Sequence, residues 1–484
     1  MIAKTETTEN NVIDINSVTE PEEAALESIG GDAHLSDMGN ATRLAYLHGD
    51  RFHWCPALGW LFYDGKRWSP TDDVLVMQYA RDVPRVLLEE AAAERLNAGR
   101  RKLLAEWALE SEKASALSNM VRLLRSEPGI RVEQEYLDQD PLLLNLQNGT
   151  LDLRRGELMR HSPGDLVTKV ANVYLDYEAK CPRWEKFLLE AMDGDTELVS
   201  YLQRWCGYLL TGRTSEQAFL FFSGDGGNGK GTFTETIAFL LGDYASPLSN
   251  TALTVRQGDA STNEWAALRG TRFAHCGEID PGKTMDSALI KTLTGEDSIS
   301  VRFLYREFFT LKPQFKIIYS ANGEPRVRDN SYGFWRRIKH VPFRVKFDGS
   351  RKDARLKEKL KEEAEGILQW ALAGLHEYLE HGMEEPEVVA AATREYRDEQ
   401  SAVKLFVEDC TTRIQGYHLL LSELHQEYQL WARSNRERSL TNKRLRKELE
   451  LMGYETMKGE RGVRICDLAL KKSATTENPS EDMG

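Results

Sequence analysis

The sequence predicts an α/β protein of several domains, with a core in which apolar strands alternate with helices. The run QAFLFFSG (217–224) is apolar, as is typical of a strand buried on both faces. The glycine-rich segment SGDGGNGKGTFTE (223–235) follows and opens the helical pattern FTETIAFLLG, which ends at Gly242. Further strands are expected at RFAHCGEID (272–280), QFKIIYSAN (314–322) and IKHVPFRVKF (338–347). The 484 residues suggest two to four domains in all.

Before this core, the chain divides into an acidic tail and an α+β module. Residues 1–38 hold nine acidic residues and one lysine, so we expect a disordered tail. The α+β module is expected over 39–180. Within it, aromatic and polar residues alternate over 39–68, which indicates a small β-rich unit. Helical spacing follows over 76–127, and turn signals punctuate short strands over 142–165.

The expected core covers 181–347 and begins with a helical stretch at 183–210. A helical segment follows at 348–405. Residues 406–470 are expected to form a winged-helix-like domain, because two helices precede two short strands around Gly459–Gly462. The composition of residues 471–484 indicates a second disordered tail.

The formal net charge of −13 is unevenly distributed. The acidic tail carries −8, which leaves −5 for the rest of the chain, and residues 432–464 hold ten Lys or Arg against five Glu. Locally positive surface is compatible with DNA binding. No apolar run approaches the ~20 residues of a membrane span, so we expect a cytoplasmic protein without membrane contact. The six scattered cysteines are expected to be reduced and mostly buried.

The glycine-rich segment predicts a site for ATP. Phosphate-binding loops follow G-x-x-x-x-G-K-[ST]: the backbone and helix N-terminus receive the phosphates, and the final hydroxyl holds Mg²⁺. Here Gly231 takes the hydroxyl position, so either Thr232 or a water molecule is expected to serve as the Mg²⁺ ligand. The expected nucleotide-binding residues are Gly224, Asp225, Gly226, Gly227, Asn228, Gly229, Lys230, Gly231 and Thr232.

Polar side chains at the ends of later strands complete the pattern of an ATPase. Glu278 and Asp280 follow the strand RFAHCG, where a carboxylate pair can hold magnesium and polarise the attacking water. Asn322 ends the next strand and can position that water. Arg336 and Arg337 come later, in WRRIKHVPF, and either can stabilise transition-state charge on a neighbour's γ-phosphate.

These motifs resemble the superfamily 3 helicases, a branch of the AAA+ ATPases. The likeness is greatest to the helicase part of phage and plasmid primase-helicases, which are related to the poxvirus primase-helicase. It covers about residues 39–410 and rests on NGTLDLRRGEL, CPRWEKFL, LTGRTSEQAFLFFSGDGGNGKGTF, LIKTLTGEDSISVRFLYREFFTLKPQFKIIYSAN and FWRRIKHVPF.

The resemblance implies a role for each of these residues. Lys230 would be the Walker A lysine, Glu278 and Asp280 the Walker B acids, and Asn322 sensor 1. An arginine finger acting in trans, Arg336 or Arg337, implies a ring, expected to be a hexamer. No acid triad for primer synthesis stands out in the N-terminal module, so a separate primase is an expected partner.

Two segments are expected to contact DNA. SISVRFLY and REFFTLKP can pair as a hairpin whose basic and aromatic residues suit single strands, although an ordinary solvated hairpin has the same pattern. The basic helix after Thr441 can enter a groove of duplex DNA or pack against the ring. The expected contacts are Lys291, Arg302, Arg306 and Lys312 around the hairpin, and Lys443, Arg444, Arg446 and Lys447 in the helix.

Together these features predict an ATP-dependent replicative DNA helicase of phage, prophage or plasmid origin, acting on single strands and on fork or origin duplex. One alternative is an ATP-binding origin-recognition or regulatory protein that does not unwind DNA. A small-molecule kinase is a second alternative, although a kinase needs neither the Asn and trans-Arg set nor a basic C-terminal unit.

Overall fold

The computed structural model describes residues 34–255, 262–277, 283–304, 308–349, 352–400, 402–435, 437, 439–459 and 462–471. The chain forms two compact units. Unit 1 comprises residues 1–175 with 241–244 and 300–310, and unit 2 comprises the rest of the chain. Among the helices that lie in these ranges, none is both long enough and apolar enough to cross a membrane.

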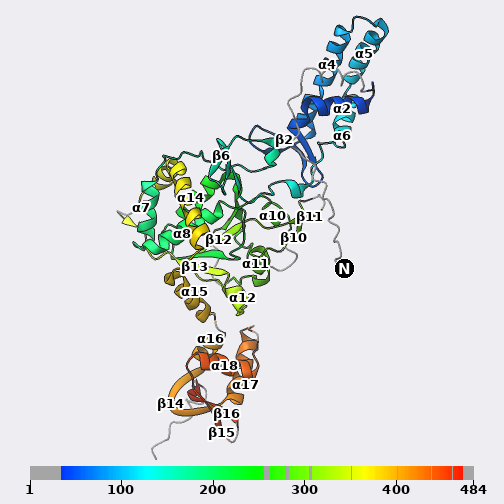
Figure 1. Cartoon of the computed structure of the whole chain (residues 1–484). Coiled ribbons are helices and arrows are strands. Elements are labelled where there is room, and N and C mark those ends of the chain that lie inside the picture. Colours follow the sequence, from blue (N-terminus) through cyan, green and yellow to red (C-terminus); the bar gives the residue numbers. More distant parts are fainter. Residues whose placement is uncertain are drawn as a thin grey trace, which may run out of the picture. The chain divides into compact units, whose positions relative to one another are not determined.

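Unit 1 combines a helical cluster with two small antiparallel sheets, ordered β1-β2-β3 and β4-β5-β6 (Figure 1). Aliphatic residues of the helices pack with Phe52 and Trp60 of the first sheet in one core. Its elements are α2 (Asp37–His48), β1 (Phe52–Cys55), β2 (Gly59–Tyr63), β3 (Trp68–Thr71), α3 (Asp73–Ala80), α4 (Asp82–Ala93), α5 (Ala98–Ser111), α6 (Ala114–Leu124), β4 (Leu143–Leu146), β5 (Gly149–Asp152) and β6 (Glu157–Met159).

The predicted helices over 76–127 and the strands over 142–165 are confirmed, but the β-rich prediction for 39–68 is wrong in its first part. Residues up to His48 form α2 instead. The Ser36 side chain caps this helix by accepting a hydrogen bond from the Gly39 amide at 3.1 Å. Ala41 and Leu44, three residues apart, turn inward and are fully buried. The helix begins at Asp37, so the last two residues of the tail expected to be disordered over 1–38 are helical.

Unit 2 contains a five-stranded parallel sheet in the order β13-β7-β12-β9-β8. Its glycine-rich connection leaves β7, which lies between β12 and β13. The elements are α7 (Pro182–Ala191), α8 (Thr196–Leu209), β7 (Phe219–Ser223), α9 (Lys230–Leu241), β8 (Ala245–Leu248), α10 (Thr262–Ala266), β9 (Phe273–Cys276), α11 (Ser287–Leu293), β12 (Lys316–Ala321), α12 (Tyr332–Trp335), β13 (Ile338–Pro342), α13 (Leu356–Glu362), α14 (Ala364–His381) and α15 (Glu387–Glu399). Two short strands, β10 (Ile299–Val301) and β11 (Phe309–Leu311), fall mostly within the segment 300–310 that belongs to unit 1.

Buried aromatic residues explain why the sheet forms at these strands. Phe219, Phe221 and Phe222 of β7 are all fully buried, as the continuous apolar run predicts. The strand expected over 338–347 ends earlier than predicted, at Pro342, which lies opposite Ser223, the last residue of β7. The Phe343 amide still donates to the Ser223 carbonyl at 2.8 Å, and beyond that point β7 gives way to the glycine-rich segment and offers no further strand to pair with. The helical stretch expected over 183–210 is confirmed, but it is divided into two helices, α7 and α8, and α14 packs along α8 (Figure 1).

The C-terminal module of unit 2 combines three helices with a three-stranded antiparallel sheet in the order β14-β16-β15. The predicted helices and the last two strands are confirmed, whereas β14, which precedes them, was not predicted. A core that includes Phe406, Tyr428, Leu445 and Ile465 joins the helices to the sheet. The elements are α16 (Ala402–Cys410), β14 (Thr411–Leu420), α17 (Leu421–Ser434), α18 (Asn442–Leu451), β15 (Thr456–Gly459) and β16 (Gly462–Leu470).

Candidate functional site

The glycine-rich loop (224–229) joins the carboxyl end of β7 to the first turn of α9. Gly224 has a φ of 152°, and a Cβ at this position would lie 1.9 Å from Asn228 Nδ2 and 2.5 Å from the Phe343 carbonyl oxygen. Asn228 Nδ2 donates to that carbonyl at 3.1 Å, and the Phe347 amide donates to the Gly227 carbonyl at 2.8 Å. Residues 343–347 therefore hold the loop in shape, and only glycine fits at position 224.

Lys230 and Asn322 meet at the carboxyl edge of the sheet. Lys230 is 4% exposed, and its Nζ donates to the Gly224 carbonyl at 2.6 Å and to Asn228 Oδ1 at 3.1 Å. A third bond, of 3.3 Å, goes to Asn322 Oδ1. Parallel pairing explains this meeting, because Ala321 of β12 lies opposite Ser223 of β7 and Asn322 follows at once. A buried ammonium, an amide and a helix N-terminus thus converge, which is a suitable setting for an anion such as a phosphate.

The expected carboxylate pair, Glu278 and Asp280, lies outside the described residues. The strand that precedes it, β9, runs parallel to β12, with Cys276 opposite Tyr319. Its carboxyl end therefore lies at the same edge of the sheet as the ends of β7 and β12. Gly231 and Thr232 lie in the first turn of α9.

Arg336 and Arg337 lie at the opposite edge of the sheet. They directly precede β13, whose first residue pairs with Phe219, the first residue of β7. The Phe219 amide donates to the Arg337 carbonyl at 2.8 Å. From Phe219 to Ser223 the strand advances roughly 13 Å, at about 3.3 Å per residue. The glycine-rich loop begins only beyond that point, so both arginines are remote from the loop of their own chain.

The two arginines differ in their surroundings. Arg336 is exposed and donates from Nη2 to Gln217 Oε1 at 2.6 Å. Arg337 is half-buried and donates from Nε to Thr294 Oγ1 at 3.2 Å and from Nη1 to the Gly333 carbonyl. Burial lowers the pKa of Arg337, and the charge of Arg336 lowers it further. Arg337 is thus tied into its own unit, whereas Arg336 faces solvent.

The predicted hairpin between the acid pair and β12 is present as β10 and β11. Arg302 stacks its guanidinium over the Phe308 ring at 4.5 Å, and Leu304 is 68% exposed. Lys312 is exposed just after β11, and Arg306 lies outside the described residues. This part of the chain therefore presents both basic and apolar side chains to solvent.

Lys291, which was expected to contact DNA, forms contacts within unit 2. Its Nζ donates to Asp329 Oδ2 at 2.5 Å and to Ser331 Oγ at 3.1 Å. These contacts tie α11 to the segment that leads into α12 and Arg336. The position of Lys291 therefore favours a role in holding that segment.

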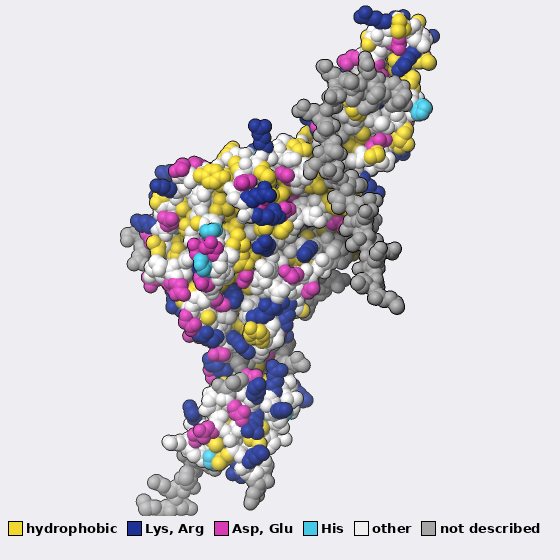
Figure 2. Space-filling model, in the orientation of Figure 1, with side chains coloured by type: hydrophobic (Ala, Val, Ile, Leu, Met, Phe, Trp, Pro, Cys, Tyr) yellow, Lys and Arg dark blue, Asp and Glu magenta, His cyan; other side chains and the backbone are white. Residues whose placement is uncertain are grey.

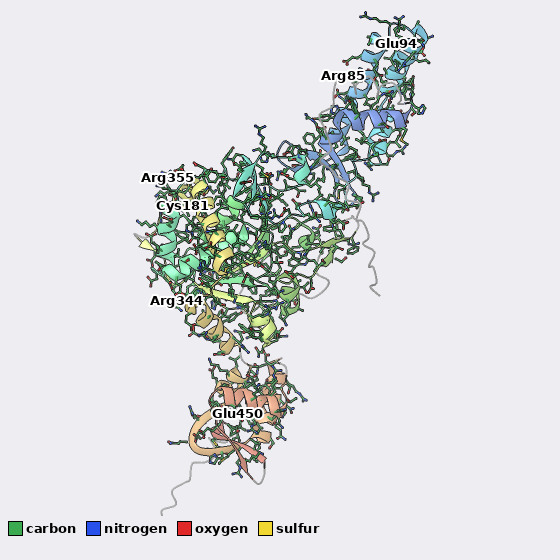
Figure 3. All side chains as sticks on the ribbon, in the orientation of Figure 1. Arg85, Glu94, Cys181, Arg344, Arg355 and Glu450 are labelled. Atoms are coloured by element: carbon green, nitrogen blue, oxygen red, sulfur yellow. The ribbon has the colours of Figure 1, made fainter. Side chains whose placement is uncertain are left out.

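In α18, three of the four expected basic residues are exposed: Lys443, Arg444 and Lys447. Arg446 instead donates from Nε to Glu450 Oε1 at 2.7 Å and from Nη2 to Thr456 Oγ1 at 2.8 Å. It thereby links α18 to β15. Figure 2 shows Lys and Arg side chains spread over the visible face of this module, and Figure 3 labels Glu450 on α18.

The segment after β13 was not predicted to belong to the site. Residues 342–346 face the glycine-rich loop across a cavity of ≈ 280 Å³, to which Arg344 (Figure 3) and Lys346 add positive charge. A larger cavity of ≈ 720 Å³ shares Val345 with it and is lined by Phe347 and by α7 residues such as Arg183 and Lys186. The only sequence signal was the pair of basic residues in PFRVKF, which also fits an exposed strand.

His340 lies behind the loop and was also missed. Burial lowers its pKa to about 4, so the ring is neutral at pH 7. Its Nδ1 lies 3.2 Å from the Ala392 carbonyl and must donate there, so Nε2 accepts from the Ser223 hydroxyl at 2.6 Å. This pair fixes the last residue of β7 before the loop begins.

Two family models match the chain. The model described as "D5 N terminal like" matches residues 41–193, and one for a family of unknown function, DUF5906, matches residues 222–337. The second match spans the glycine-rich loop, Asn322 and both arginines.

Several relatives among curated proteins are viral. A "putative helicase" of Acanthamoeba polyphaga mimivirus is 28% identical over 323 residues, covering 62% of this chain and 34% of that protein. A "putative helicase" of Frog virus 3 is 35% identical over 145 residues, covering 28% and 15%. A "putative primase" of African swine fever virus is 25% identical over 224 residues, covering 44% and 23%. The chain thus spans about a third or less of the length of these relatives.

Among solved structures, the C-terminal region of NrS-1 in an apo form matches with a TM-score of 0.49 and 13% identity, over 75% of this chain and 76% of that one.

Proposed function

Because the chain belongs to the phage and viral primase-helicase family, we propose that it is an ATP-driven replicative DNA helicase of superfamily 3. The observation that carries this proposal is the meeting of Lys230 with Asn322 beside a glycine-rich loop, at the carboxyl edge of a parallel sheet. The strand order, with β7 between β12 and β13, supports an AAA+ core.

The proposed nucleotide is ATP with Mg²⁺. The loop amides and the N-terminus of α9 would receive the phosphates, and the Lys230 ammonium would exchange its contacts with loop carbonyls for contacts with phosphate oxygens. Asn322, already 3.3 Å from Lys230 Nζ, would orient the attacking water. Bound Mg²⁺ would offset charge on the phosphates, and its proposed ligands include Glu278 and Asp280.

The chain would act as a ring in which each site takes an arginine from a neighbouring copy. Arg336 is the better candidate for this role, because Arg337 is tied to Thr294 and Gly333. Arg336 lies at the edge of the sheet remote from its own loop, so it can serve only a second molecule. Tyr332, one helical turn before Arg336, is 76% exposed, and an exposed aromatic beside an arginine is typical of an interface core. A hexamer is the proposed form.

DNA would contact the hairpin of β10 and β11 as a single strand and the C-terminal module as duplex. Exposed Arg302, Phe308 and Lys312 suit phosphates and stacked bases. The order of helices and strands in the C-terminal module, with sheet order β14-β16-β15, supports a winged helix in which α18 enters a groove. A separate primase is a proposed partner.

Strand displacement and ATP hydrolysis, measured on wild type and Lys230→Ala, test the proposal. The wild type should hydrolyse ATP and separate a forked duplex, and the variant should do neither. Lys102→Ala is a matched control, because this lysine is exposed on α5 of unit 1. Hydrolysis without strand separation by the wild type would favour the ATP-dependent origin-binding alternative. A wild type without ATPase activity would rule out the enzyme.

A further inference from the structure

Gly231 occupies the position at which phosphate-binding loops usually have a Ser or Thr hydroxyl. The backbone conformation there does not require glycine. Gly231 lies within α9, and its Cβ position is open: apart from the two adjacent residues and the backbone of the helix itself, no atom lies nearer than 3.8 Å. Gly224, by contrast, admits no Cβ at all. The missing hydroxyl at Gly231 is therefore not a consequence of how the loop folds, and the space beside it is available to another group.

The nearest atom to that space is Oε1 of Glu235, 3.8 Å from the Cβ position of Gly231. Helical residues are about 100° apart, so a residue four positions on returns to within about 40° of the same face. Side chains also lean toward the N-terminus of their helix, so that each covers the turn before it. Glu235 therefore lies over Gly231 from one turn along α9.

Thr232 faces elsewhere. It follows Gly231 directly and is rotated from it by about 100° around the helix. Its carbonyl accepts the Thr236 hydroxyl at 2.7 Å, as in a regular helix, so α9 is not distorted in a way that would bring Thr232 round. Glu235 is thus a better substitute for the hydroxyl than the threonine next to it in sequence.

The charged groups around Glu235 fit this role. Its carboxylate pairs with Lys357 of α13, and both side chains are more than half exposed, so the pair can exchange with solvent or an ion. Burial lowers the pKa of His275, and the charge of Glu235 partly offsets that effect. The carboxylate is thus within electrostatic reach of β9, the strand that leads to Glu278 and Asp280.

We propose that Glu235 replaces the hydroxyl that Gly231 lacks, and gives Mg²⁺ a carboxylate oxygen either directly or through a metal-bound water. The inference rests on the proposed function and deepens its metal site. Magnesium prefers carboxylate and water oxygens, and commonly keeps several of its waters. In the metal-free state, Lys357 balances the charge of the carboxylate.

Binding of a fluorescent ATP analogue, titrated with Mg²⁺ and repeated in EDTA, separates metal contact from nucleotide contact. Glu235→Gln should raise the Mg²⁺ concentration for half-maximal binding about tenfold and leave binding in EDTA unchanged. Thr232→Ala should not raise the Mg²⁺ requirement, whatever its effect on nucleotide binding in EDTA. Lys357→Met, which breaks the same ion pair but keeps the carboxylate, should not raise the Mg²⁺ requirement.

A rescue variant gives a second, independent measurement. Gly231→Ser restores the usual hydroxyl, so in a Glu235→Gln background it should bring the Mg²⁺ requirement back toward the wild-type value. A Glu235→Gln protein that matches the wild type, or a requirement that rises in Thr232→Ala instead, would overturn the inference while leaving the nucleotide site intact. A wild type that binds no nucleotide in either condition would overturn both the inference and the proposed function.

Discussion

The two edges of the parallel sheet in unit 2 are built in opposite ways. At the carboxyl edge, Lys230 is 4% exposed and is held by the loop and by Asn322. At the amino edge, Arg336 is exposed and its partner Gln217 is itself a surface residue. The first edge has a fixed geometry suited to a small anion, whereas the second presents a solvent-exposed positive charge. One ATPase site would therefore need one edge from each of two copies.

Substituting the arginines tests this contrast with the largest expected effect. Arg336→Ala should lower ATP hydrolysis about a thousandfold while ATP affinity and melting temperature stay near wild-type values, because an arginine finger contacts only the transition state. Arg337→Ala should instead lower the melting temperature, since it leaves Thr294 and Gly333 without their donor. If Arg337→Ala proved well folded but inactive and Arg336→Ala stayed active, the assignment would be reversed.

The next prediction contrasts two glycines of the carboxyl edge. Gly224→Ala should reduce ATP affinity at least thirtyfold, about 2 kcal/mol, because its Cβ would collide with Asn228 and the Phe343 carbonyl. Gly231→Ala meets no such obstacle and should stabilise α9 by up to about 1 kcal/mol. Nucleotide titration and thermal melting measure both effects. Equal losses of affinity in the two variants would show that the shape of the loop does not depend on Gly224.

How far the sequence alone predicts this arrangement depends on the kind of contact. Parallel strands end at the same edge of a sheet, so the meeting of Lys230 and Asn322 followed from the strand pattern. The contacts of Lys291 with Asp329 and of Arg446 with Thr456 did not, because a basic side chain in a sequence does not reveal which acceptor it will find.

Sequence patterns also gave wrong predictions of secondary structure where the same residues fit either a helix or a strand. The aromatic alternation over 39–68 hid α2, whose cap and buried face decide the outcome. The strand β14 was missed because its register shifts between Arg413 and His418, around Gly416, which interrupts a simple alternation.

The contrast between a tied and an exposed basic residue recurs on α18, where smaller effects are expected. Lys447→Ala should weaken duplex binding a few-fold, because one phosphate contact is lost. The slope of log K, the binding constant, against log salt concentration should become shallower by about one. Arg446→Ala should mainly destabilise the fold, because it removes the hydrogen bonds to Glu450 and Thr456. We expect the free energy of unfolding to fall by about 1 kcal/mol, measured as a lower melting temperature. Unaltered duplex binding by Lys447→Ala would favour a packing role for this helix.

The smallest predicted effect concerns pH at the carboxyl edge. Burial, together with the charge of Glu399, raises the pKa of Glu324 to about 7, above its ordinary value. The folded state therefore holds this proton more tightly than the unfolded state, and stability should fall as pH rises from about 4.5 to about 7. Glu324→Gln removes the charge. At pH 8 it should increase the free energy of unfolding by about 1 kcal/mol and raise the melting temperature, whereas at pH 5 it should change neither. An equal shift at both values would argue against this titration.

Mixing two inactive variants tests the central claim most directly. Lys230→Ala removes the carboxyl-edge contribution, and Arg336→Ala removes the amino-edge contribution. If each site combines the two edges from different copies, mixed assemblies contain some sites in which both residues are intact. The account predicts that the mixture hydrolyses ATP faster than either variant alone. A mixture no more active than its components, although mass measurement shows mixed assemblies, would contradict it.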